Sequence, residues 1–139
     1  MRTNHNEFII LSAFVDADYW TNDFRDDRLY GILDDLGCKF KTIEGCYQGT
    51  RELSYMVQLE HYKGFTEEFF LEIASKQFDQ ECILHKDKYN KIYLLYPATY
   101  GGKKYFDTYE KQLIGTEFVQ CDSTAENYSI IDGKYWKVA

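Results

Sequence analysis

The strongest constraint on the fold is an apolar run near the start of the chain, Phe8 to Val15, which only Ser12 interrupts. Apolar side chains occupy both alternating faces of this run, a pattern typical of a central strand that is covered on both sides. The run is far shorter than the roughly 20 residues of a membrane-spanning helix, and Asp16 and Asp18 follow it at once. We therefore expect a buried central strand and no membrane segment.

Two helices are predicted by apolar periodicity and by capping residues. The first begins near Asn22 and ends at Leu36, with Gly37 placed to cap it. The second covers residues 67–78 after Thr66, an N-cap residue. Phe65 and Phe70 flank that cap at the positions of a hydrophobic staple.

The remaining segments predict strands and a C-terminal extension. Alternating apolar residues predict strands over 38–43, 52–59, 82–86, 91–96 and 116–120, a turn-rich connection over 45–49, a short helix near 105–113, and a hairpin turning at Asp132-Gly133. Pro97 is expected to end the strand before it. This order predicts an α+β fold with a ferredoxin-like βαββαβ core over about 8–97 and a mostly antiparallel sheet. A C-terminal β-hairpin extension over about 103–139 would complete a single domain, 1–139.

Composition and charge exclude several classes of protein. The chain is 45% hydrophobic and 18% aromatic, which is ample for a packed core. Its formal net charge of −7 disfavours direct binding to a phosphate backbone. The four cysteines form no C-x-x-C pair and have no histidine at zinc-ligand spacing, so we expect thiols in a cytoplasmic protein.

No cofactor or metal site is predicted from the sequence. His5, His61 and His85 are scattered, outside any nucleophile or metal signature, and are expected at the surface. Phosphate-binding and dinucleotide-binding glycine patterns and the G-x-S-x-G motif are absent from the sequence. The sequence therefore gives little positive indication of an enzyme.

Three polar residues are candidates for the lining of a pocket. Glu52 and Ser54 share one face of a predicted strand, and Gln80 follows the second helix. An acid–base pair must lie within hydrogen-bond reach of a reacting group, which a sequence does not show. The alternative is a hydrogen-bonded sheet face without catalytic function.

The first helix is strongly acidic. Between Asp16 and Asp35 there are seven aspartates against Arg25 and Arg28. The helical period predicts that four of these aspartates point away from the apolar stripe. Two aromatic residues precede them in the chain. These candidate partner-binding residues are Tyr19, Trp20, Asp23, Asp26, Asp27 and Asp34. They suit a basic partner, and the alternative is a solvated helix face.

Residues 8–96 resemble an uncharacterised family of short bacterial and phage proteins. The likeness lies in Ala13-Phe14 at the end of the first strand, in Gly49, Glu52 and Ser54, and in Phe78 and Gln80. The family's asparagine-proline pair is replaced here by Val15-Asp16. The resemblance implies no known activity. In size, acidity and aromatic content the chain is also similar to early phage proteins that inhibit host machinery.

Together these observations predict a non-enzymatic, phage-encoded binding protein of the host cytoplasm. It would block a host nucleic-acid enzyme or defence protein by binding a basic surface of that protein. Two alternatives stay open: a small enzyme or ligand-binding domain that uses the Glu52, Ser54 and Gln80 face, and a homo-oligomeric structural module such as a homodimer.

Overall fold

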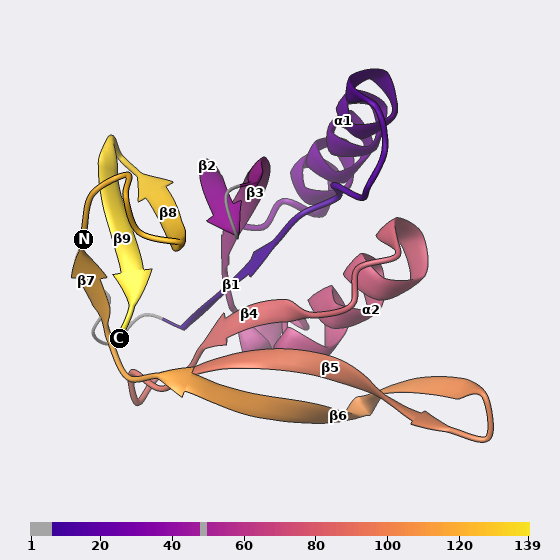
Figure 1. The fold of residues 1–139 in the computed structure, drawn as a ribbon. Helices are drawn as coiled ribbons and strands as arrows, with labels where there is room; N and C mark the ends of the chain where they lie inside the picture. The colour runs from indigo at the N-terminus through magenta and orange to yellow at the C-terminus, as the bar shows by residue number, and fades with distance from the viewer. Residues whose placement is uncertain (1–6, 48–49) are drawn as a thin grey trace.

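The computed structural model describes residues 7–47 and 50–139, which form nine strands and two α-helices (Figure 1). In chain order these are β1 Phe8–Leu11, α1 Tyr19–Leu36, β2 Phe40–Tyr47, β3 Thr50–Gln58, the short 3-10 helix η1 His61–Lys63, α2 Glu67–Phe78, β4 Ile83–Lys86, β5 Ile92–Tyr100, β6 Lys103–Gly115, β7 Phe118–Gln120, β8 Asn127–Ile131 and β9 Lys134–Val138. Neither α-helix of these described segments is long and apolar enough to cross a membrane.

All nine strands belong to one antiparallel sheet. Its order is β6-β5-β4-β1-β3-β2-β8-β9-β7. The edge strands β6 and β7 are consecutive in the chain, and the amide of Thr116 between them donates to the carbonyl of Ala139 at 2.9 Å. The sheet therefore curls into a half barrel, with both helices on its outer, convex side (Figure 1).

Gly115 allows the curled sheet to close at this corner. A Cβ atom built on Gly115 would collide with the Val138 side chain and would lie 2.5 Å from the carbonyl oxygen of Ala139. Only glycine, which has no Cβ atom, fits so close to another backbone.

The main core lies between the sheet and the helices. Strand alternation turns Ile9 and Leu11 toward this side, where they pack with Leu29 and Leu33 of α1 and with Phe70 of α2. The local signals at the helix ends are confirmed. Gly37 caps α1 with a φ of 71°, the Thr66 side chain accepts from the Phe69 amide at 3.2 Å, and the staple rings Phe65 and Phe70 lie 6.2 Å apart.

The predicted ferredoxin-like fold is wrong, although the mostly antiparallel sheet and the two helices are confirmed. The four strands expected in that fold are not a separate unit. The sheet continues past them with β5 and β6 at one edge and with β8, β9 and β7 at the other. The C-terminal segment supplies four of the nine strands, and it carries the curl that a ferredoxin-like sheet lacks.

The helix predicted near 105–113 is also wrong, because this segment belongs to β6. Phe106 and Tyr109 both pack against the main core although they are three residues apart. That spacing is typical of a helix, but here it results from the register shift between Tyr96 and Ala98 of the partner strand β5. The bulge turns both rings to one side of the sheet.

Pro97 lies at the same bulge and does not end β5, which continues to Tyr100. A proline lacks the amide hydrogen of a regular ladder, and a bulge is one of the few places where a strand accepts it. Residues 45–47 of the expected turn-rich connection continue β2, whereas residues 48–49 lie outside the described part. The hairpin turn at Asp132-Gly133 is confirmed, with φ values of 52° and 79°.

Candidate active site on the concave face of the sheet

The concave side of the half barrel contains a large hollow with a volume of about 1330 Å³. Strand alternation points Ile10 and Leu84 into it, away from the helices, and Leu94, Phe118 and Trp136 line it from the two sides of the sheet. A small-molecule site typically encloses about 300–1000 Å³, so this hollow can hold a nucleoside-sized ligand with its mouth still open.

One part of the hollow is apolar. Phe118 and Trp136, which line the hollow, belong to a second buried cluster, separate from the core beneath the helices, and Ile10 packs against it. The Trp136 ring is 9% exposed, and its indole nitrogen donates to no acceptor in the described segments. This nitrogen is itself buried, so it does not face the open space of the hollow.

The opposite part of the hollow carries Glu52. Its strand position pairs with Gly45 of β2, which has no side chain to cover the carboxylate. Burial raises the pKa of Glu52, and a hydrogen bond with Ser12 lowers it only in part. Within residues 7–47 and 50–139 Glu52 forms no ion pair. Among the described residues it is thus a partly desolvated carboxylate without a cationic partner.

The three residues of the predicted polar pocket have different positions. Glu52 and Gln80 both line the hollow. Gln80 donates from its amide nitrogen to the carbonyl oxygens of Phe14 at 2.7 Å and Phe78 at 3.1 Å, so it holds the loop after β1 against the end of α2. Ser54 is buried on the same sheet face but does not line the hollow.

The acidic helix α1 forms part of the rim. Tyr19, Asp23 and Asp26 line the hollow, whereas Trp20 is 77% exposed and lies outside it. Asp27 and Asp34 are exposed and also lie outside the hollow. That these side chains contact a basic protein stays a prediction.

Asp26 differs from its expected orientation, because it is buried. Tyr55 donates a hydrogen bond to Asp26 at 2.8 Å and so joins α1 to the sheet. Burial raises the pKa of Asp26, an effect that the Tyr55 hydrogen bond opposes and that Asp27 and Asp23 increase. Burial together with the adjacent Asp26 likewise raises the pKa of Tyr55 well above its usual range.

Several residues of the hollow were not predicted from the sequence. Arg51 stands at its rim, where its guanidinium lies 3.7 Å from Glu44 and donates to the Tyr128 hydroxyl at 3.4 Å. Cys82 and Tyr96 also line it, and burial raises the pKa of the Cys82 thiol, which therefore stays protonated near neutral pH. The alternation of side chains along its strand could have predicted that Tyr96 faces the hollow. Arg51 and Trp136, in contrast, reach the hollow only because the sheet curls.

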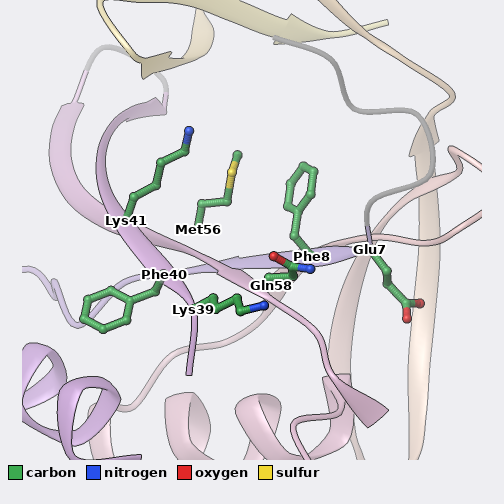
Figure 2. A pocket seen from close by; sticks show the side chains of 7 residues that line it. All are labelled: Glu7, Phe8, Lys39, Phe40, Lys41, Met56 and Gln58. Atoms are coloured by element: carbon green, nitrogen blue, oxygen red, sulfur yellow. The ribbon is translucent and has the colours of Figure 1, made fainter. Parts of the chain in front are cut away.

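A second, smaller hollow of about 260 Å³ crosses β1, β2 and β3 (Figure 2). Figure 2 shows that its lining side chains diverge: Phe8 and Met56 point to one side of the sheet, and Glu7 and Phe40 do not point toward them. Its polar groups do not converge on a common point, so we place the candidate site in the larger hollow.

Fold and site together define a small protein whose curled antiparallel sheet encloses an acidic, aromatic-lined hollow. The S-adenosylmethionine lyase family model matches residues 9–139, and the chain belongs to this family. No curated protein gives a significant match in a sequence comparison.

This family membership corrects the predicted function. The name of the S-adenosylmethionine lyase family indicates an enzyme, which contradicts the predicted non-enzymatic inhibitor of a host protein. The small enzyme or ligand-binding domain, which was the alternative, agrees better with the finding. An origin in a phage stays a prediction.

Proposed function

We propose that the chain is an enzyme that cleaves a carbon–sulfur bond of S-adenosylmethionine, without water as a reactant, in the hollow on the concave face. The observation that carries this proposal is the Glu52 carboxylate, which has no ion-pair partner among the described residues and lies in a hollow with an apolar wall, within the 9–139 segment that the lyase family matches. The substrate's sulfonium centre is a permanent cation, so it complements this carboxylate.

The remaining groups of the hollow suit the rest of the substrate. Phe14, Tyr19 and Tyr96 offer ring faces on which an adenine can stack. The Arg51 guanidinium at the rim matches a carboxylate, because two parallel N–H donors fit its two oxygens.

The apolar wall favours the bond cleavage itself. Breaking any carbon–sulfur bond of a sulfonium leaves a neutral thioether, so positive charge disperses in the transition state. Water stabilises the concentrated charge of the ground state more than the dispersed charge of the transition state. Ile10, Leu84 and Phe118 replace part of that water with apolar surface, which lowers the barrier.

Glu52 has a different part in this scheme. Its carboxylate attracts the intact cation more than it attracts the partly neutralised transition state, so it acts mainly on substrate binding and orientation. The base or nucleophile of a water-free cleavage must come from the substrate or from another side chain. Glu52 is then a binding residue.

The proposal is tested by product analysis in water enriched in oxygen-18. Purified protein should convert S-adenosylmethionine to a neutral thioether, and at early times no product should carry an oxygen-18 atom. The E72Q variant is the matched control, since Glu72 lies on α2 away from the hollow and pairs with Lys76. Absence of turnover contradicts the proposal, and an oxygen-18 atom in the product formed at the enzymatic rate contradicts the water-free route.

A further inference from the structure

A second group of reactive side chains lies on the opposite side of the sheet from the hollow. It consists of Glu7 just before β1, His61 in η1, Glu67 at the start of α2 and His85 in β4. Figure 2 shows Glu7 pointing away from the side of the sheet that Phe8 faces. His85 pairs in register with Ile9 of the main core, so it too lies on the helix side.

The four side chains converge closely. The Nε2 atom of His85 lies 3.1 Å from one oxygen of Glu7, and the Nε2 atom of His61 contacts the other oxygen. His61 Nε2 also lies 3.9 Å from Glu67 Oε2. One ligand atom from each of Glu7, Glu67 and His85 can be chosen so that all lie within 4.8 Å of one another.

The surroundings leave part of this group unsatisfied. The side chains of Glu7 and Glu67 are only 19% and 16% exposed, and that of His85 is 7% exposed. Tyr109 donates to one oxygen of Glu67 at 3.1 Å, but the other oxygen is buried and accepts no hydrogen bond from the described residues. Two nearby carboxylates away from water need positive charge between them.

A divalent metal ion meets this need better than protons alone. Imidazole nitrogens and carboxylate oxygens together are ligands of zinc and of related transition-metal ions. Zinc holds such ligands at about 2.0–2.2 Å in a tetrahedron, which places neighbouring ligand atoms about 3.3 Å apart. The 3.1 Å between His85 and Glu7 is already close to this spacing, and the 3.9 Å between His61 and Glu67 is somewhat longer.

We propose that Glu7, His61, Glu67 and His85 form a binding site for a divalent transition-metal ion of the zinc type. The metal replaces the proton-mediated contacts of Glu7 with the two histidines and takes the free oxygen of Glu67. Tyr109 acts as an outer partner that orients Glu67.

The position of the site defines its role. It connects the start of β1, the adjoining η1 and α2, and β4, which are well separated in the chain. It lies across the sheet from Glu52, so the metal stabilises the fold and does not contact the proposed substrate. This inference is therefore independent of the proposed function.

Untagged protein that has been treated with a chelator provides the test. Titration with Co²⁺, followed by visible absorption, should give one saturable site with nitrogen and oxygen ligands, and Zn²⁺ should displace the cobalt. H61A and E67Q should each weaken the affinity at least tenfold, and E72Q, on the same helix outside the cluster, should not. His61 is half exposed, so H61A should fold even if a change at the buried His85 does not.

Three results would overturn the proposal. The first is the absence of saturable binding to folded protein. The second is binding that H61A and E67Q leave unchanged. The third is a thiolate-to-cobalt charge-transfer band that disappears on alkylation, since this would place the metal on the free cysteines. A rise in melting temperature with Zn²⁺ in the wild type and in E72Q, but not in H61A or E67Q, would support it.

Discussion

Replacement of Glu52 by glutamine removes the negative charge of the hollow and keeps the shape of the side chain. At 4 Å, two unit charges interact by about 1 kcal/mol in bulk water and by about 4 kcal/mol at the effective dielectric of a protein surface. Glu52 is half-buried in an open hollow, so its contribution lies between these limits. We expect E52Q to weaken binding of S-adenosylmethionine by roughly 5-fold to several hundred-fold.

The assay compares two ligands that differ in charge. S-adenosylhomocysteine is the neutral thioether analogue of the proposed substrate. E52Q should weaken binding of the cationic ligand and leave binding of the neutral one within about twofold, because only the charge–charge term is lost. In kinetics, KM should rise more than kcat falls.

The same residue predicts a pH dependence. Burial raises the pKa of Glu52 above its ordinary value of 4.5, so the carboxylate becomes protonated at a higher pH than an exposed glutamate. Affinity for the cationic substrate should therefore fall as the pH is lowered through this raised pKa, and it should be recovered above it. E52Q should remove this dependence.

E52Q should keep its fold, since a folded-state pKa above the unfolded value means that folding disfavours the ionised form. A neutral amide therefore does not cost stability through charge. Two results would refute the reasoning: equal losses of affinity for the cationic and the neutral ligand, or a large fall in kcat at constant KM. The second result would make Glu52 a general base instead of a binding residue.

Three further predictions concern stability and are measured by denaturant unfolding. Y55F should lower the free energy of unfolding by about 1.5–3 kcal/mol at neutral pH, because it leaves the buried Asp26 carboxylate without its donor, and the loss should shrink as acid protonates Asp26. G115A should cost about 1–3 kcal/mol, since its Cβ meets the Ala139 backbone, and G31A, where a Cβ meets nothing within 4 Å, is its control. T66A should cost about 1 kcal/mol through the lost N-cap of α2. An unchanged midpoint in any of the three would contradict the corresponding contact.

The candidate site was partly visible in the sequence. Alternation placed Glu52 and Ser54 on one strand face, and Gln80 was expected near them. The structure puts Glu52 and Gln80 at the hollow and leaves Ser54 outside its lining. His85 was expected at the surface, which is wrong because the pairing of β4 with β1 buries it.

The sequence by itself determined the features that depend on neighbouring residues. Helix ends at Gly37 and Thr66 and the turn at Asp132-Gly133 follow from local backbone preferences and short-range hydrogen bonds. These preferences act within a few residues, so a local pattern suffices to predict them.

Only the tertiary structure decided the width and the curl of the sheet. These depend on pairings between distant segments, such as β2 with β8, and on the close contact of Gly115 with Ala139. The bulge in β6 gave this strand the spacing of a helix, so the local pattern wrongly predicted a helix there. The hollow exists because the curl brings Glu52, Arg51 and Trp136 around one space, and no short stretch of sequence contains that information.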